Sequence, residues 1–173
     1  LPFFLAAEQA KKDGVRVLLS GLGSEEIFGG YERHEKAQNL NKECLFGLLK
    51  MYERDLYRDD VVTMANTIEL RLPFLDKELV EYSLKIPGKY KINYNDSNVK
   101  KYNIKKYNVK KYILRLAAQK LGVPEEFAFR KKQAAQYGSK FDRAIGKLAK
   151  SEEKSKSQYL AKYLPHLNKK LGV

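Results

Sequence analysis

The feature that most constrains the fold is the stretch of residues 15–31, where an apolar run passes through a glycine-rich turn into a helix start. The apolar run at residues 15–19 is typical of a strand buried on both faces of a parallel sheet. Ser24 is a candidate N-cap for the following helix. The turn between strand and helix contains Ser20, Gly21 and Gly23. Because open α/β sheets bind ligands at the carboxyl ends of their strands, this turn is a candidate ligand site, with a purely structural tight corner as the alternative.

The identities of the residues in this region are more specific than the spacing of its glycines. The segment from Leu18 to His34 resembles the second signature of the synthase domain of asparagine synthetases. Three further stretches are similar to the same family, in the same order: Leu56 to Met64, Ile68 to Asp76, and Lys111 to Arg115 followed by Phe129 to Gln133 and Gly138. Ordered motifs that extend over residues 1–139 favour common ancestry over chance.

The resemblance implies a function. Members of this family activate a carboxylate with ATP and magnesium, release pyrophosphate, and let ammonia attack the acyl-adenylate to form an amide. We therefore expect a ligase of the glutamine-hydrolysing asparagine synthetase type, with ATP and Mg²⁺ as cofactors and an aspartate-like carboxylate as substrate. The implied fold is α/β and mostly helical: the C-terminal part of an adenine-nucleotide α-hydrolase-like domain, that is, a pyrophosphate-loop ATPase, with little of its parallel sheet.

The first residue is Leu, and the family's pyrophosphate-binding loop lies upstream of the matched region. We expect a fragment whose catalytic site is incomplete without that upstream part and without a glutaminase domain. Residues 1–150 are predicted to be synthase domain, and residues 151–173 a linker with a short basic helix. Apolar residues 1–7 are too short for a signal peptide or a membrane span, so we expect a cytoplasmic protein with no membrane partner.

The resemblance also assigns roles to individual residues. The predicted nucleotide contacts are Ser20, Gly21 and Gly23. Glu25 stands where the family usually has Asp and is the predicted magnesium ligand, since either carboxylate supplies the hard oxygens that this ion prefers. The predicted catalytic residues are Lys132, which would clamp the leaving pyrophosphate, Lys111 as a secondary contact, and Glu69 and Arg71, which would line the synthase cleft.

The sharpest departure from the family pattern is Leu22. Synthetases usually have a Glu at this place, and Leu has neither a proton to transfer nor a charge to offer. Some asparagine-synthetase-like proteins also carry an aliphatic residue there. The alternative is therefore a homologue that keeps the fold without turnover and serves as a binding or scaffold protein.

Several residues also have plain structural interpretations. Glu69 and Arg71 share one side of an extended segment and could be a buried pair that only orients a loop. Asp76, directly after this segment, is the predicted cap of a helix at residues 77–86. Asp59 and Asp60 could bind metal or simply favour the N-terminus of a helix. Cys44 is the single cysteine, which excludes an internal disulfide, and a packed thiol is the simpler interpretation. It lies in an amphipathic stretch with Asn41 as a candidate cap and a predicted inward face of Leu45, Leu48, Leu49, Tyr52 and Leu56.

The segment 89–108 departs from its surroundings. It contains a five-residue repeat of the form Asn-Val/Ile-Lys-Lys-Tyr, and this period suits neither a helix nor a strand. We interpret it as a lysine-rich insertion ahead of a helix at residues 109–121, whose predicted inward residues are Ile113, Leu116, Ala117 and Leu121. The formal net charge of +13 equals the sum of residues 89–112, which carry +7, and the C-terminal residues 140–173, which carry +6. Nucleic acid is an alternative partner for the repeat, whose tyrosines could stack on bases, but a solvated low-complexity insertion is favoured.

Overall fold

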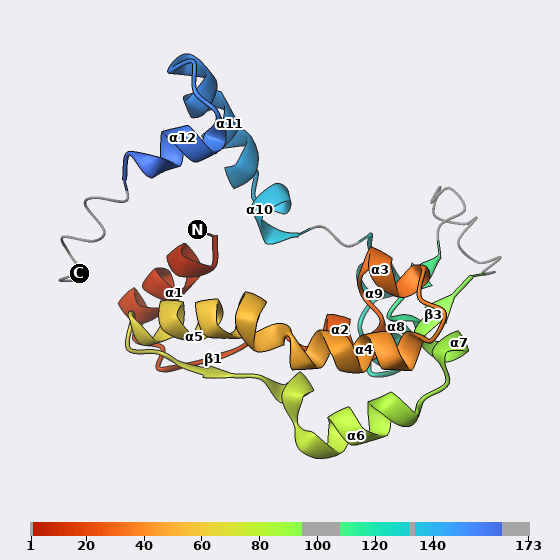
Figure 1. The fold of residues 1–173 in the computed structure, drawn as a ribbon. Coiled ribbons are helices and arrows are strands. Elements are labelled where there is room, and N and C mark those ends of the chain that lie inside the picture. Colours follow the sequence, from red (N-terminus) through yellow and green to blue (C-terminus); the bar gives the residue numbers. More distant parts are fainter. Residues whose placement is uncertain (1, 95–107, 132–133, 164–173) are drawn as a thin grey trace. The chain divides into compact units, whose positions relative to one another are not determined.

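The computed structural model describes residues 2–94, 108–131 and 134–163, which are mostly helical with little sheet (Figure 1). The chain divides into two compact units. Residues 7–130 form the larger unit, and residues 1–6 group with the chain from residue 131 onward in the smaller one. Helix α1 (Pro2–Lys12) begins in the smaller unit and ends in the larger one. In the described part of the chain, no helix combines the length and the apolar character that crossing a membrane requires.

A parallel pair of strands positions the glycine-rich turn. Strand β1 (Val17–Leu19) pairs with β2 (Glu69–Arg71), with Leu18 opposite Leu70. The predicted strand and the predicted extended segment are therefore confirmed. The expectation that β1 is buried on both faces is wrong for this chain, because Leu19 is 73% exposed. A sheet of two short strands has too few neighbouring side chains to cover both of its faces.

The turn leads into the short helices α2 (Ser24–Phe28) and α3 (Glu32–Glu35). Gly23 precedes α2 in the left-handed region, with φ 96°, which glycine adopts without a steric cost. The prediction that Ser24 caps this helix is wrong, because Ser24 is its first residue and its hydroxyl donates to Glu25 instead. Helix α2 forms part of the core, since Ile27 is completely buried.

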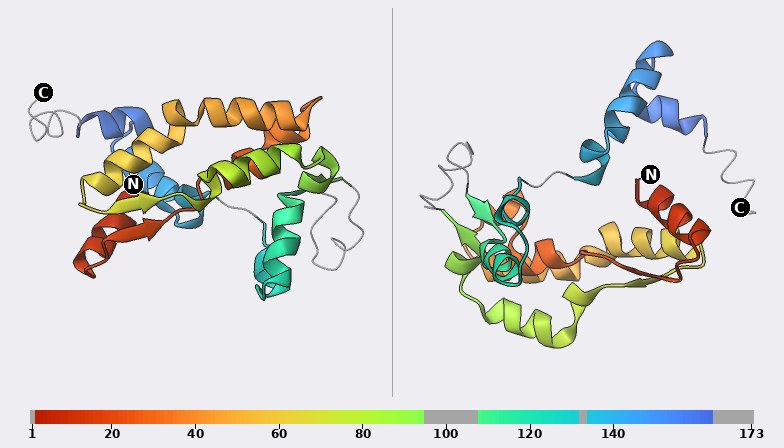
Figure 2. Two further views of the ribbon diagram at one scale, coloured as in Figure 1. Left: turned by 90° about the horizontal axis from the view of Figure 1, so that it is seen from below. Right: turned by 180° about the vertical axis from the view of Figure 1, so that it is seen from behind.

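Three consecutive helical segments follow and form one long rod, which Figures 1 and 2 show from different directions. It consists of α4 (Leu40–Leu49), a π-helix (Tyr52–Leu56) and α5 (Tyr57–Met64). The side chain of Asn39 caps α4 by accepting from the Lys42 amide at 3.0 Å, so the predicted cap at Asn41 is wrong. Asn41 donates to two backbone carbonyls near the end of α6 instead, those of Leu84 and Ile86.

Only part of the predicted apolar face turns inward, where Leu48 and Leu56 are at least half-buried. Leu45, Leu49 and Tyr52 are 45%, 72% and 62% exposed, whereas Cys44 and Met51 are buried. Gly47 is buried too, and a Cβ at this position would lie 3.1 Å from Arg33 Nη2. Small side chains on this face let α4 approach α2 and α3 closely, and this close contact outweighs the larger apolar area of the opposite face.

The chain then passes through a short 3₁₀ turn (Pro73–Leu75) into α6 (Lys77–Lys85) and α7 (Gly88–Lys91). Asp76 caps α6 by accepting from the Leu79 amide at 3.0 Å, as the sequence predicts. Leu84 of α6 packs against a small core cluster formed by Leu40, Cys44 and Ile92. The thiol of Cys44 is completely buried, and burial raises its pKa, which agrees with the packed thiol expected from the sequence.

Two short antiparallel strands flank residues 94–108, the later part of the predicted insertion, whose first residues belong to α7 and to the first of these strands. Strand β3 (Ile92–Asn93) pairs with β4 (Val109–Lys110), and α8 (Tyr112–Lys120) and α9 (Glu125–Ala128) follow. The predicted helix at residues 109–121 therefore begins later than expected. Its predicted inward residues Leu116 and Leu121 are 40% and 86% exposed, which corrects that expectation. The repeat itself lies largely in residues 95–107, outside the described part of the chain.

The smaller unit contains α10 (Ala135–Gly138), α11 (Phe141–Ser151) and α12 (Lys156–Ala161). Helix α11 begins after Lys140, which has a left-handed backbone with φ 63°. Helix α12 has a side-chain cap, since Ser155 Oγ accepts from the Gln158 amide at 3.3 Å. Ala149 and Tyr159 are the buried apolar residues of α11 and α12, with 2% and 8% of their surface exposed.

Candidate functional site

The predicted nucleotide turn lies at the carboxyl ends of both strands. The Ser20 amide donates to the Arg71 carbonyl at 3.0 Å, directly after the last paired residues of β1 and β2. Ser20 Oγ accepts from the Leu22 amide at 3.2 Å, which closes the turn. This position is the one at which parallel sheets offer backbone amides and hydroxyls to ligands.

The two glycines of the turn, Gly21 and Gly23, have different surroundings. Gly21 is exposed, and a Cβ added there would meet no atom of the described residues within 4 Å. Gly23 is buried, and its Cβ would lie only 2.6 Å from Leu75 Cδ2. Gly23 is therefore required for packing, whereas Gly21 leaves the backbone open to a ligand.

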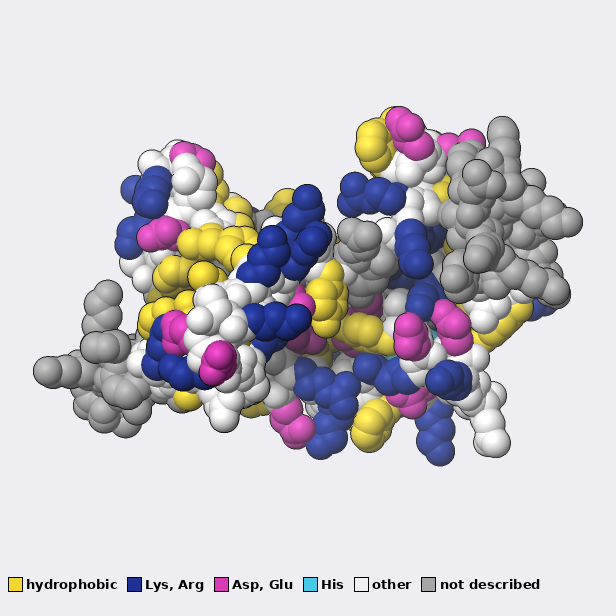
Figure 3. All heavy atoms as spheres, turned by 90° about the horizontal axis from the view of Figure 1, so that it is seen from above, with side chains coloured by type: hydrophobic (Ala, Val, Ile, Leu, Met, Phe, Trp, Pro, Cys, Tyr) yellow, Lys and Arg dark blue, Asp and Glu magenta, His cyan; other side chains and the backbone are white. Residues whose placement is uncertain are grey.

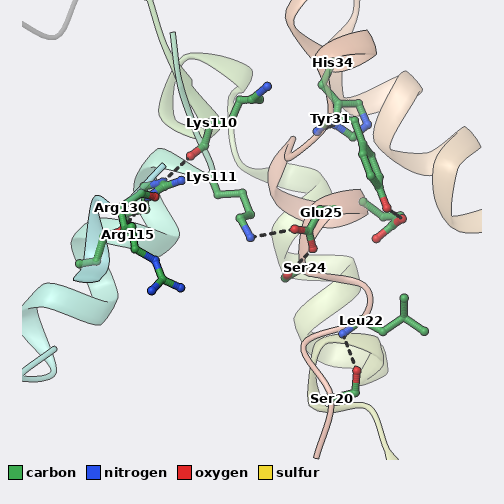
Figure 4. A network of polar contacts seen from close by, with 12 residues as sticks. Ser20, Leu22, Ser24, Glu25, Tyr31, His34, Lys110, Lys111, Arg115 and Arg130 are labelled. Atoms are coloured by element: carbon green, nitrogen blue, oxygen red, sulfur yellow. Dashed lines mark hydrogen bonds and ion pairs between the residues drawn. The ribbon is translucent and has the colours of Figure 1, made fainter. Parts of the chain in front are cut away.

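An ion pair joins α2 to the start of α8 (Figure 4). Lys111 Nζ lies 3.0 Å from Glu25 Oε1, and Ser24 Oγ donates to the other Glu25 oxygen at 2.8 Å. Both charged side chains are largely shielded, with 16% of Glu25 and 19% of Lys111 exposed. Lys111 reaches Glu25 from a left-handed backbone position, with φ 56°, between β4 and α8. The structure therefore brings together two of the predicted site residues that lie far apart in the sequence.

Arg115 holds the chain segments around this ion pair, and sequence reasoning did not select it. Its Nε donates to the Lys110 carbonyl at 2.7 Å, and its Nη1 donates to the Ala128 and Arg130 carbonyls at 2.8 and 3.1 Å. Burial lowers the pKa of Arg115, and the charge of Glu25 opposes this shift. The available signal was its place one helical turn after Lys111 in a stretch that resembles the family.

Glu26 differs from its neighbour Glu25 in its surroundings. It is only 4% exposed, and its Oε1 accepts from the Tyr31 hydroxyl at 2.8 Å. Its Oε2 is buried and has no hydrogen-bond partner among the described residues. Burial first, and then the hydrogen bond to Glu26, raise the pKa of Tyr31. Glu26 therefore belongs to the packed layer beneath the turn, whereas Glu25 faces Lys111.

Glu69 and Arg71 form a pair on β2. Arg71 Nε lies 2.8 Å from Glu69 Oε1, and each side chain is 60% exposed. The interpretation as a buried pair is therefore wrong, because the narrow sheet leaves this side of β2 uncovered. The backbone of Arg71 meets the nucleotide turn through the Ser20 amide, so the pair lies beside the predicted site. Its place in a synthase cleft stays a prediction.

The last predicted catalytic residue, Lys132, lies outside the described residues. The chain before it is held in place, since the Arg130 carbonyl accepts from Arg115. The alternative metal ligand Asp59 is 6% exposed and pairs with Arg58, with 2.6 Å between Arg58 Nη2 and Asp59 Oδ1. Asp59 therefore has a structural partner.

The side chains near the turn can be compared with the ligands that the predicted magnesium ion requires. Among the described residues, no three His, Cys, Asp or Glu side chains converge on one point that could hold a metal ion. Proteins commonly bind Mg²⁺ through one or two carboxylates, with the remaining ligands supplied by water and substrate phosphates. Glu25 fits this mode as a single carboxylate ligand, next to a turn in which the backbone of Gly21 is exposed.

Comparisons with known proteins bear on this site. The sequence model of the asparagine synthase family matches residues 1–44 and 33–169. The putative glutamine-hydrolyzing asparagine synthetase 1 of Methanocaldococcus jannaschii is 40% identical over 196 aligned positions, which cover 99% of this chain and 36% of that protein. The asparagine synthetase domain-containing protein 1 of Mus musculus is 34% identical over 155 positions, covering 86% of this chain and 23% of that protein.

The glutamine-hydrolyzing asparagine synthetase 1 of Saccharomyces cerevisiae is 34% identical over 143 positions, covering 76% of this chain and 23% of that protein. The chain thus spans between about a quarter and about a third of the length of these relatives. The family match covers nearly the whole chain and includes the turn, Glu25, Lys111 and Arg115. The resemblance read from the motifs is thereby confirmed, and the chain belongs to the asparagine synthase family.

Proposed function

We propose that this chain supplies part of the synthase site of an ATP-dependent amide ligase of the asparagine synthetase type. In the first half-reaction, a carboxylate oxygen of an aspartate-like substrate attacks the α-phosphorus of ATP, and the bond to the pyrophosphate group breaks. In the second, ammonia attacks the acyl carbon, AMP leaves, and a proton is released as the amide forms. Ammonia would come from glutamine through another part of the whole protein.

The observation that carries this proposal is the meeting of the Ser20–Gly23 turn with the Glu25–Lys111 pair. The turn offers the Ser20 hydroxyl and the exposed backbone of Gly21 at the carboxyl end of a parallel pair of strands. The pair places a carboxylate and an ammonium group 3.0 Å apart directly after it. Amides and an ammonium group stabilise phosphate oxygens, and fixed donors of this kind act without reorganising during the reaction.

In this proposal, each site residue of the chain has a separate role. Ser20 and Gly21 would bind phosphate or ribose oxygens of the nucleotide. Lys111 would hold the negative charge that develops as pyrophosphate leaves. Arg115 would keep the Lys110 and Arg130 carbonyls in place, and with them the segments that carry the predicted site lysines. Lys132 would be the main contact to pyrophosphate, in keeping with the family motif around it.

Glu25 would hold magnesium once its link to Lys111 loosens. The ion, when bound with ATP, neutralises phosphate charge and polarises the phosphoryl group. Glu25 lies next to Ser24, whose hydroxyl fixes the orientation of the carboxylate by donating to it at 2.8 Å. Because Lys111 occupies one Glu25 oxygen, nucleotide and metal would have to bind together: the phosphates attract Lys111 while the metal takes the carboxylate.

A second candidate function is a homologue that binds nucleotide without turnover. Leu22 favours it, because an aliphatic side chain at this place removes the acid–base group that synthetases usually have. Figure 4 shows the Leu22 side chain directed away from the Glu25–Lys111 pair. The Leu22 amide, by contrast, still closes the turn through Ser20. Nucleotide binding could thus survive without adenylation.

The test uses the whole protein to which this chain belongs. Aspartate-dependent exchange of labelled pyrophosphate into ATP, followed by asparagine formation from glutamine or ammonium, supports the ligase. Saturable binding of ATP with magnesium, but no exchange with aspartate or related carboxylates, supports the non-catalytic homologue. If ATP binding is absent, or is unchanged by Ser20→Ala combined with Gly21→Val, the assignment of the turn is wrong.

A further inference from the structure

Helix α11 carries three cations that have no acidic partner among the described residues. Arg143, Lys147 and Lys150 are all exposed and follow one another at spacings of four and three residues. At 100° per residue these positions lie within a narrow sector of the helix surface. We call the three side chains the α11 basic face. On the side of the molecule drawn in Figure 3, Lys and Arg side chains gather in several patches between acidic and hydrophobic ones.

Two of the three acids in the described part of the same unit are occupied elsewhere, and the third, Glu153, is exposed in the turn after α11 and forms no ion pair with a described residue. Asp142 binds Lys156 at 2.7 Å, while Glu152 binds Lys154 at 3.0 Å and also pairs with Lys162. These ion pairs neutralise lysines of α12 and the connection before it. The positive charge of α11 is left without such compensation in the described part of the unit. An uncompensated row of charges attracts an external polyanion instead.

The spacing of the α11 basic face suits a phosphate backbone. At a rise of 1.5 Å per residue, the seven-residue separation of Arg143 and Lys150 spans about 10 Å. On one strand of duplex DNA, phosphates follow one another every 3.4 Å along the axis, so a phosphate backbone of comparable spacing places about three phosphates along this length. The three side chains also line a hollow of about 490 Å³ together with the ion-paired Lys154 and Lys156.

The other side of α11 argues against a lipid surface. A helix that lies in a membrane interface inserts an exposed apolar face among the acyl chains. Phe141 and Ile145 are at least half-buried in the unit, and Ala149 is 2% exposed. Only Leu148, at 51% exposure, breaks the pattern. The available contact is therefore one of charge, without a matching apolar contribution.

We propose that the α11 basic face is a docking surface for the phosphate backbone of RNA. Its side chains are exposed and flexible, so they would contact phosphates and not read bases. The binding would be independent of sequence and steeply dependent on salt. This surface is separate from the lysine-rich insertion, and it does not depend on whether the synthase site is active.

The experiment compares variants of the full chain by fluorescence anisotropy with a labelled single-stranded RNA of mixed sequence, over a range of salt concentrations. The triple variant Arg143→Gln, Lys147→Gln, Lys150→Gln should weaken binding at least tenfold at low salt. Because each lost phosphate contact on a single strand lowers the salt slope by about 0.7, the slope should fall by about 2. Circular dichroism and thermal melting establish that the variant is folded.

The matched control removes the same charge from scattered exposed positions in Lys11→Gln, Lys85→Gln, Lys120→Gln. This variant should retain the affinity and the salt slope of the parent to within about twofold. A second comparison deletes residues 98–107 and should leave the affinity within the same range. Equal losses in the two triple variants, loss only on deletion of the repeat, or binding to phosphatidylserine vesicles in the absence of RNA binding would each overturn the proposal.

Discussion

Lys111 Nζ lies 3.0 Å from Glu25 Oε1, so the residue with the predicted magnesium role is held by an ammonium group from the other side of the site. Lys110, next to it in the chain, pairs with Glu35 at 2.9 Å and has a comparable exposure of 26%. Neighbouring lysines thus form two similar ion pairs with different acids. Only the first of these pairs lies at the nucleotide turn.

This arrangement predicts a difference between two neighbouring variants. Lys111→Met and Lys110→Met should each lower the stability of the fold by about 1 kcal/mol, as expected for a partly shielded ion pair. In the whole protein, only Lys111→Met should also lower pyrophosphate exchange and change the magnesium concentration needed for nucleotide binding. Urea unfolding and metal titrations measure the two effects. Identical metal titrations for both variants would contradict a special role of Lys111.

Arg115 should be irreplaceable by lysine. Its guanidinium group donates to three backbone carbonyls in fixed directions, and an ammonium group cannot reproduce this planar fork. We expect Arg115→Lys to lower the free energy of unfolding by about 2 kcal/mol, since hydrogen bonds from a charged group are lost in a partly buried place. The control is Arg54→Lys at an exposed position on the π-helix. An unchanged urea midpoint for Arg115→Lys would disprove the prediction.

Leu22→Glu should increase adenylation in the whole protein if the missing acid–base group limits the reaction. General acid–base help contributes roughly a hundredfold to ten-thousandfold, so even residual pyrophosphate exchange should rise measurably. Leu22→Met serves as the packing control, because Leu22 is half-buried. Parent protein that already exchanges as fast as ordinary synthetases would refute the idea. A Leu22→Glu protein that does not fold would show that the position has a packing role.

Removal of residues 98–107 should leave the melting temperature nearly unchanged. The strands before and after the deleted residues are already paired, Ile92 with Lys110 and Asn93 with Val109. Deletion leaves a connection of five residues, a length that β-hairpins accept, and the entropy of closing a loop depends only weakly on its length. A drop of several degrees in differential scanning calorimetry would show that the repeat contributes to the packing.

The lowered pKa of His34 leads us to expect that the fold loses stability in mild acid. Burial, followed by the positive charges of Arg33, Lys91 and Lys110, lowers its pKa from 6.5 to about 4. Between these two values the unfolded chain binds a proton that the folded chain does not, so stability rises with pH across this window and falls as pH drops through it. The loss below pH 4 is of the order of 3 kcal/mol, because each pKa unit corresponds to about 1.4 kcal/mol.

Carboxylates titrate in the same range, so the measurement is a comparison between the parent and His34→Asn. The Asn side chain can still accept from the Tyr31 amide, as His34 Nδ1 does at 3.2 Å. Urea unfolding at several pH values should show a weaker dependence on pH for His34→Asn between pH 4 and 6.5. The same slope for both proteins would show that His34 does not account for the acid sensitivity.

The local elements around the site follow from preferences that can be recognised in the sequence. The apolar run and its glycines predicted β1 and the turn, the alternation around Leu70 predicted β2, and Asp76 predicted the start of α6. Each of these depends on the preferences of residues that are close in sequence, because backbone geometry and capping are local. The sequence motifs likewise identified the family, since recognising a motif requires only the identities and the order of its residues.

Which helix faces meet depends on packing between distant segments. The apolar stripe of Leu45 and Leu49 points outward, because the small residues on the opposite side of α4 let α2 and α3 approach more closely. The Glu25–Lys111 pair and the carbonyls that Arg115 binds join segments that are far apart or separated by a turn, and no periodicity in the sequence encodes these contacts. Local preferences do not distinguish between the faces of a helix, and packing determines which face is buried. The residues that meet at the site therefore follow from the fold.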